Sequence, residues 1–183
     1  MTNLTNTLKT MQEETAGVKN DVINYLLENS NNNEDLQTLL NDIVSYGCES
    51  GQVNHLIYYT DTVEYFEEHE NEITEMLYQL GIEDVETYEG IEQLGNIFPN
   101  LDIIDYRFDD LQNRTDEEIE ENYTIEELEE MDEEERDEIE TEILNSLNPY
   151  ELNKVDKNYL AWAIFEYNAS VLFDELEEMA LIK

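Results

Sequence analysis

Hydrophobic residues recur every three or four positions along most of the chain, a spacing that places their side chains on one face of a helix. The pattern predicts helices over about residues 21–29, 34–46, 61–80 and 156–179. The last of these is apolar around most of its circumference, which predicts that it is the central, buried helix. Gly47 and Gly81 follow two of the predicted helices, as is usual for glycines that end a helix.

Three other stretches are less clear. Residues 1–19 are polar and predict a frayed or weakly helical lead-in. Residues 50–60 include the β-prone sequence VNHLIYYT, for which we favour a short helix over the alternative of a buried strand. Residues 101–108 alternate weakly and could form a strand or one arm of a hairpin. The predicted fold is therefore mainly α: a compact helical domain over residues 20–183, with a short β-hairpin within residues 82–114 as an option.

An acidic run shows signs of regular structure. Residues 115–142 contain 17 Asp or Glu in 28 residues, a density typical of disordered tails. However, Thr124 is followed three positions later by Glu127, and Asp132 by Glu135, as at the N-termini of helices. The apolar residues of this part of the chain also have helical spacing: Ile125, Leu128, Met131, Ile139, Ile143 and Leu147. We therefore predict acidic helices attached to a core.

The spacing of these charges resembles that of DNA. A helix of 28 residues would be roughly 42 Å long, so the run would carry one negative charge per roughly 2.5 Å. Double-stranded DNA carries about one per 1.7 Å of its axis, and a neighbouring acidic helix would close the difference. The leading hypothesis is a protein that imitates DNA to occupy a nucleic-acid-binding partner. The alternative is an acidic face that only keeps the protein in solution.

The composition of the whole chain favours the first hypothesis. The 48 acidic and eight basic residues give a formal net charge of −40, and residues 20–106 contain no Lys or Arg. Solubility of a small domain needs a net charge of only about 2 to 8, and the excess opposes folding through self-repulsion. Leu, Ile, Val and Phe make up 49 of the 183 residues, which is enough for a hydrophobic core.

The sequence also indicates a compartment and limits the classes of partner. It shows no secretory signal and no apolar run approaching 18 residues, so we expect a cytoplasmic protein that does not enter a membrane. Cys48 is the only cysteine, which excludes an intramolecular disulfide. The negative charge argues against direct binding to nucleic acid or to anionic lipid.

Motifs for catalysis are not found. His69 and Glu70 begin like a zinc-protease helix, but Ile73 occupies the position of the second histidine. His55, His69 and Cys48 lack the spacing of metal ligands, so we expect structural roles for them. We predict a protein that is not an enzyme and that needs no cofactor or metal.

Two segments resemble a known family. Residues 47–73, GCESGQVNHLIYYTDTVEYFEEHENEI, resemble a phage and mobile-element family with the pattern G-C-x-S-G-x-V-x-x-L-I-Y-Y-x-D-T. Residues 158–169, NYLAWAIFEYNA, are similar to the closing L-A-W-x-A-F-E helix of that family, with Ile164 in place of an alanine. The resemblance implies a mobile-element origin and carries no mechanism. Residues 82–157, between the two segments, are expected to be an acidic insertion.

In composition the chain resembles acidic anti-restriction and anti-CRISPR proteins of phages. This resemblance implies an inhibitor that acts in the bacterial host cell by occupying the DNA-binding channel of a CRISPR effector nuclease, with a restriction enzyme as the second target. An acidic chaperone or sequestering partner of basic proteins is an alternative of a different class. A metal-buffering or salt-adapted protein is a third, although abundant Tyr, Ile and Asn fit salt adaptation poorly. The oligomeric state is open, with a dimer as one option.

The predicted partner-binding surface consists of acidic positions on the outer faces of the predicted helices. Nine come from the acidic run: Asp116, Glu117, Glu120, Glu121, Glu126, Glu127, Glu130, Glu133 and Glu134. Four more come from the helix before it: Glu64, Glu67, Glu68 and Glu72.

Overall fold

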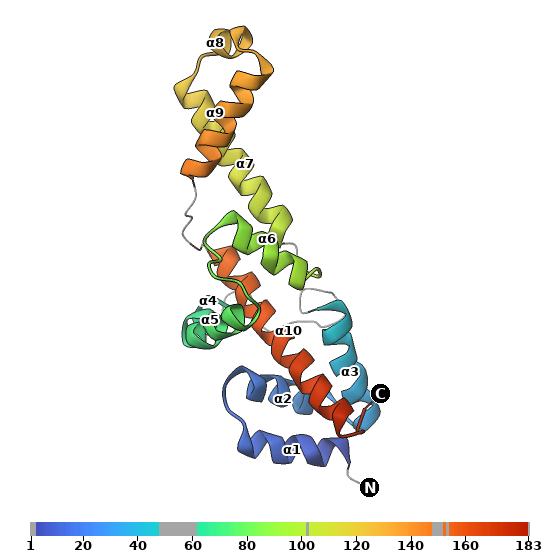
Figure 1. Cartoon of the computed structure of the whole chain (residues 1–183). Coiled ribbons are helices and arrows are strands. Elements are labelled where there is room, and N and C mark those ends of the chain that lie inside the picture. Colours follow the sequence, from blue (N-terminus) through green and yellow to red (C-terminus); the bar gives the residue numbers. More distant parts are fainter. Residues whose placement is uncertain (1–2, 48–61, 102, 148–151, 153, 183) are drawn as a thin grey trace. The chain divides into compact units, whose positions relative to one another are not determined.

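The computed structural model describes residues 3–47, 62–101, 103–147, 152 and 154–182 (Figure 1). These described residues form ten α-helices and no strand, so the prediction of a mainly α fold is confirmed. The short helix or strand expected at residues 50–60 falls outside the described residues, as do Cys48 and His55. Among the helices that are described, none is long and apolar enough to cross a membrane.

The chain forms two compact units. Residues Met1–Gly81 and Asn153–Lys183 make up the first unit, and Ile82–Leu152 make up the second. The expected evolutionary insertion at about residues 82–157 stays a prediction.

The first unit is built around one long helix, α10 (Lys154–Glu178). This helix contacts α2, α3, α4 and α5, and its residues Leu160, Ala163 and Leu172 are fully buried. The predicted central helix is therefore confirmed. The other helices of the unit are α1 (Leu4–Glu14), α2 (Gly17–Asn29), α3 (Asn33–Tyr46), α4 (Thr62–Glu68) and α5 (Glu70–Gln79).

Two predictions for the first unit are corrected. The N-terminal residues are not a frayed lead-in, because α1 packs against α2 and α3 and buries Leu4 and Leu8. The single helix predicted over residues 61–80 is divided into α4 and α5 at His69, whose backbone leaves helical geometry at φ −109° and ψ 14°. The two glycines behave as expected, because Gly47 and Gly81 have φ angles of 75° and 79°.

The described residues of the second unit form four helices, of which α7 is the longest. The side chains of Ile91, Leu94, Ile103 and Leu111 lie in its core. Helix α7 packs against α6 and also against α9, to which the side chain of Gln112 donates a 3.2 Å hydrogen bond. The helices are α6 (Tyr88–Ile97), α7 (Ile103–Asn122), α8 (Ile125–Glu130) and α9 (Glu133–Ser146).

The optional hairpin within residues 82–114 is not shown, because residues 103–108 belong to α7. The buried positions are Ile103, Arg107, Leu111 and Thr115, which recur every fourth residue on one helical face. Two of these four residues are polar, so hydrophobic periodicity alone does not reveal this buried face of α7. The side chain of Arg107 is 2% exposed and donates a 3.2 Å hydrogen bond to the carbonyl oxygen of Val85.

Candidate protein-binding surface

Two capping boxes fix the ends of the acidic helices in the second unit. The hydroxyl of Thr124 accepts a hydrogen bond from the Glu127 backbone N–H at 3.3 Å, and the Glu127 carboxylate accepts one from the Thr124 N–H at 2.8 Å. Asp132 and Glu135 form the same reciprocal pair at the start of α9. Both predicted N-caps are thus confirmed. The bond from the Thr124 backbone, followed by that from its hydroxyl, lowers the pKa of Glu127 below its ordinary value.

Several of the basic side chains have partners inside the protein. The guanidinium of Arg136, the one base within residues 115–142, donates to the Leu128 carbonyl oxygen near the C-terminus of α8, with its Nε 2.9 Å away. In the first unit, Lys19 pairs with Glu175 at 2.6 Å and Lys157 pairs with Glu67 at 3.4 Å. These positive charges hold helices in place, and most of the carboxylates have no cation to balance them.

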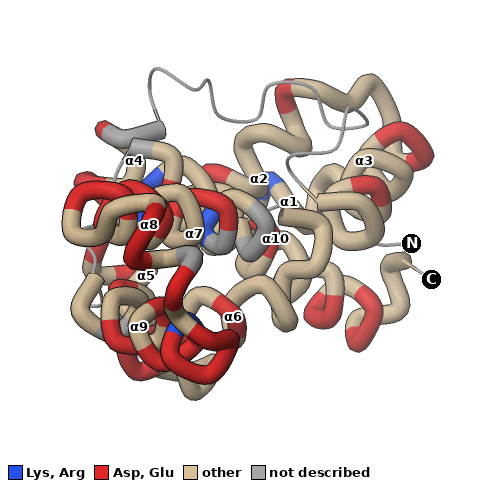
Figure 2. The backbone as a smooth tube through the Cα atoms, turned by 90° about the horizontal axis from the view of Figure 1, so that it is seen from above, with Lys and Arg blue, Asp and Glu red and all other residues tan. Residues whose placement is uncertain are grey.

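All thirteen predicted partner-binding residues are exposed, and they belong to both units. The nine from the acidic run lie on α7, α8 and α9 of the second unit, where Figure 2 shows acidic residues along much of each helix. The second unit has 27 acidic and three basic residues, a formal net charge of −24. The other four, Glu64, Glu67, Glu68 and Glu72, lie on α4 and α5 of the first unit. The second unit therefore carries the larger share of the candidate surface.

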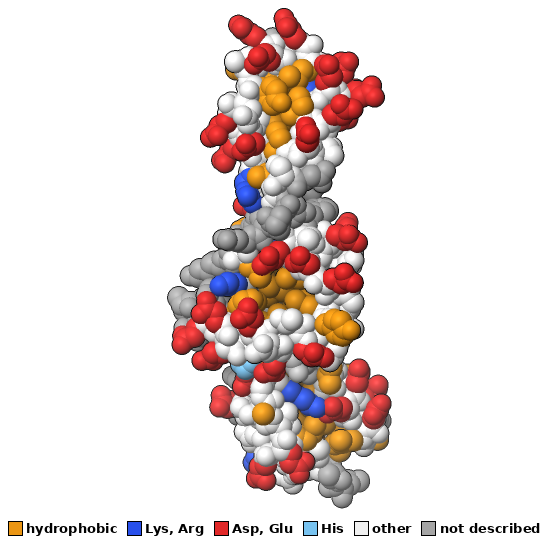
Figure 3. All heavy atoms as spheres, turned by 60° about the vertical axis from the view of Figure 1, so that its left-hand side comes forward, with side chains coloured by type: hydrophobic (Ala, Val, Ile, Leu, Met, Phe, Trp, Pro, Cys, Tyr) orange, Lys and Arg blue, Asp and Glu red, His pale blue; other side chains and the backbone are white. Residues whose placement is uncertain are grey.

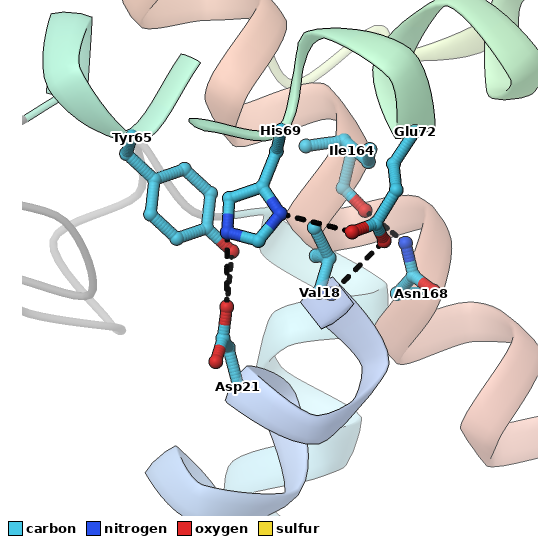
Figure 4. A network of polar contacts seen from close by, with 7 residues as sticks. All are labelled: Val18, Asp21, Tyr65, His69, Glu72, Ile164 and Asn168. Carbon is cyan, nitrogen blue, oxygen red and sulfur yellow. Dashed lines mark hydrogen bonds and ion pairs between the residues drawn. The ribbon is translucent and has the colours of Figure 1, made fainter. Parts of the chain in front are cut away.

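Three of the thirteen carboxylates also have internal structural partners. Glu127 closes the capping box of α8, and Glu67 pairs with Lys157. Glu72 accepts a 3.0 Å hydrogen bond from the backbone N–H of Val18, in the first turn of α2 (Figure 4). No local sequence pattern predicts this last contact, because Val18 and Glu72 are 54 positions apart.

The side chain of His69 lies between the carboxylates of Glu72 and Asp21 (Figure 4). Its Nδ1 lies 3.0 Å from Glu72, and its Nε2 lies 3.5 Å from Asp21 of α2. The hydroxyl of Tyr65 donates a 2.9 Å hydrogen bond to Asp21, and the Tyr65 and His69 rings are 4.4 Å apart. This network joins α2 to α4 and α5 at the point where the chain breaks between the two helices. The described residues include no group of three or more His, Cys, Asp or Glu side chains that could hold a metal ion.

The predicted apolar stripe on the acidic helices is only partly correct. Ile125 is 76% exposed and Met131 lies beyond the end of α8, so Ile125, Leu128 and Met131 do not form one buried face. Leu128 instead lines a hollow between α7, α8 and α9 that has a volume of about 240 Å³. The residues that line it are Ile119, Leu128, Arg136, Ile139 and Glu140.

Some of the acidic residues lie where they weaken their own helices. Glu120 and Glu121 are in the last turn of α7, and Glu177 and Glu178 are in the last turn of α10. A helix has a partial negative charge at its C-terminus, and an acidic side chain there is unfavourable by about 0.3 to 1 kcal/mol. None of the ten described helices has a Lys or Arg in its last turn to offset this. Helix stability therefore does not explain the placement of these acidic residues.

One protein-family model matches residues 15–178, and it is described as a domain of unknown function, DUF7222. No curated protein and no solved structure matches the chain.

Proposed function

We propose that this chain, which belongs to the DUF7222 family, inhibits a basic nucleic-acid-binding protein by imitating DNA. In this proposal the acidic helices α7, α8 and α9 occupy the surface that the partner uses for nucleic acid. The protein acts by binding and uses no catalytic residue or cofactor. It works in the cytoplasm of a bacterial cell as an anti-defence factor of a phage or mobile element.

The observation that carries the proposal is the dense array of carboxylates on α7 and α9. The two helices pack against each other and together contain 15 acidic residues. Helix α7 has 20 residues and is therefore about 30 Å long. The pair carries one negative charge per roughly 2 Å, close to the value of about 1.7 Å for double-stranded DNA. The acidic run of residues 115–142 is not one helix: it folds back on itself, so that α9, which contains its second half, lies beside α7.

The rigidity and position of the charges further support the proposal. The capping boxes at Thr124 and Asp132 hold α8 and α9 in defined conformations, so the carboxylates do not sit on a disordered tail. Because α7 and α9 pack against each other, their carboxylates are also held close together within the second unit.

For the partner we propose a nuclease of a bacterial defence system. A CRISPR effector is the first choice, because the composition resembles that of acidic anti-CRISPR proteins and because such an effector binds its heteroduplex in a positively charged channel. A restriction enzyme is the second choice. In both cases the inhibitor and DNA would compete for the same basic residues.

The test begins with a pull-down from a host lysate that identifies the bound protein, followed by a competition assay between the chain and target DNA. One variant carries Glu→Gln at Glu120, Glu121, Glu133 and Glu134 in the second unit. The control carries Glu→Gln at Glu13, Glu14, Glu177 and Glu178, which are exposed residues of the first unit. Both variants lose four negative charges.

Exposed charge pairs contribute about 0.2 to 1 kcal/mol each. The second-unit variant should therefore lose about 1 to 4 kcal/mol of binding free energy, a roughly five- to several-hundredfold weaker affinity if the effects add. The control should bind nearly as tightly as the wild type. Equal losses in both variants would favour an acidic chaperone that senses only net charge, and simultaneous binding of DNA and the chain would refute DNA mimicry.

A further inference from the structure

We infer that the hollow between α7, α8 and α9 receives one apolar side chain, carried on a Lys- or Arg-rich segment of the partner protein. The inference rests on the proposed function, which supplies the positive charge of the partner. It adds a contact that DNA mimicry alone does not require.

The hollow offers a surface for an apolar group. Ile119 of α7, Leu128 of α8 and Ile139 of α9 contribute one apolar side chain each, and all three are only half-buried. An uncharged side chain that enters here would remove apolar surface of both molecules from water.

The walls of the hollow are held in place before any partner binds. Arg136 is fixed by the hydrogen bond from its guanidinium to the Leu128 carbonyl oxygen. Glu140 accepts a hydrogen bond from Gln112 of α7 at 3.2 Å, which links α9 to α7. A preformed site loses less conformational entropy on binding than one that must be ordered. Arg136 also repels a Lys or Arg head group inside the hollow, and Glu140, the one carboxylate of its lining, already accepts the hydrogen bond from Gln112, so the entering side chain is uncharged.

The charge around the hollow selects the kind of molecule that carries this side chain. Figure 3 shows an apolar patch among acidic side chains in the part of the second unit formed by α7, α8 and α9. Exposed carboxylates lie beside the lining residues on each helix, among them Glu120, Glu127 and Glu135. This field repels nucleic acid, anionic lipid and a second copy of the chain. It favours a cationic protein segment, because the carboxylates around the hollow attract the positive charges of Lys and Arg.

The test uses two synthetic peptides as probes of the full-length wild-type chain. Both are fluorescein-labelled helical peptides of Lys and Ala with the same net charge, and they differ in one central residue, Leu or Ala. Fluorescence anisotropy at 0.1 M salt measures their Kd values. We expect the Leu peptide to bind about tenfold more tightly, because an open hollow buries part of the three additional carbon atoms. The salt dependence of the two Kd values should be the same, since it reflects the charges that both peptides share.

Matched variants locate the effect. Leu128→Gln removes an apolar lining residue without changing the net charge, and it should abolish the preference for the Leu peptide. Leu144→Gln is the control, because Leu144 is 38% exposed on α9 and does not line the hollow. The control should keep the tenfold preference. Circular dichroism checks that both variants fold. If Leu128→Gln does not fold, the comparison of the two peptides on the wild-type chain still tests the apolar contact.

The outcomes separate this inference from the proposed function. Equal binding of the two peptides to the wild type, with strong salt dependence, would refute the apolar contact and leave the charge-based function standing. A preference for Leu that persists in a folded Leu128→Gln variant would also refute it. Failure of both peptides to bind at 0.01 M salt would count against the inference and the proposed function together.

Discussion

Replacing Glu72 by Ala should destabilise the first unit although it relieves charge repulsion. In a protein with a formal net charge of −40, removal of one carboxylate reduces self-repulsion and should by itself be favourable. Glu72, however, accepts the backbone N–H of Val18 at the start of α2. The N-cap residue of that helix, Ala16, makes no side-chain hydrogen bond of its own, so the carboxylate of Glu72 takes the place of a cap.

The local structure sets the size of this effect. Gly17 has a φ of 67°, and a Cβ atom there would come within 2.5 Å of the Glu72 carboxylate, so the glycine makes room for the contact. Loss of a helix N-cap costs about 0.5 to 2 kcal/mol, and a hydrogen bond to a charged group contributes about 1.5 to 3 kcal/mol. The Glu72 side chain is 45% exposed, and solvent screening therefore reduces the contribution of this hydrogen bond. We expect a loss of about 1 to 2 kcal/mol in the free energy of unfolding.

The assay is urea denaturation followed by tryptophan fluorescence. Trp162 is the only tryptophan and lies on α10, so its signal reports on the first unit. Glu75→Ala is the matched control, because Glu75 is exposed on the same helix and accepts a hydrogen bond from Gln79, only one turn away. The control should change stability by no more than a few tenths of a kcal/mol. A Glu72→Ala variant that is as stable as the control, or more stable than the wild type, would refute the reasoning.

Two further predictions concern the charge and the caps. The melting temperature should rise between 0.01 M and 0.1 M NaCl, because the Debye length falls from about 30 Å to about 10 Å and screens the carboxylates from one another; a flat or falling curve from circular dichroism would contradict this. In Thr124→Ala the pKa of Glu127 should move up toward its ordinary value, because a hydrogen bond from the Thr124 hydroxyl is lost while the one from the backbone remains. Since the folded pKa is lowered, the cap of α8 stabilises the wild type above the ordinary pKa of the group and weakens as the pH falls through the lowered value. A ¹³C NMR titration of the Glu127 carboxylate measures its pKa in the wild type and in the variant. An unchanged pKa in the variant would contradict the role of the hydroxyl.

The features that the sequence determined by itself are those that depend on neighbouring residues. The N-caps at Thr124 and Asp132, the first of them as a capping box, were predicted because their partners lie three positions away. Gly47 was predicted to end a helix because a positive φ angle is a property of glycine itself. The central position of α10 followed from the apolar residues around its circumference. The density of charge on the acidic helices was likewise a matter of composition and helical rise.

Other features were decided only by the tertiary structure, because they depend on residues that are distant in sequence. The division of one predicted helix at His69 accompanies contacts with Asp21, which is 48 positions earlier. The helical face that contains Arg107 was hidden from hydrophobic periodicity, since a guanidinium can be buried only where the fold supplies a hydrogen-bond acceptor such as the Val85 carbonyl. The hollow at Leu128 is formed by side chains of three helices, which only the packing of α7, α8 and α9 brings together. Local spacing determines which helices form, whereas long-range packing decides which of their side chains remain exposed.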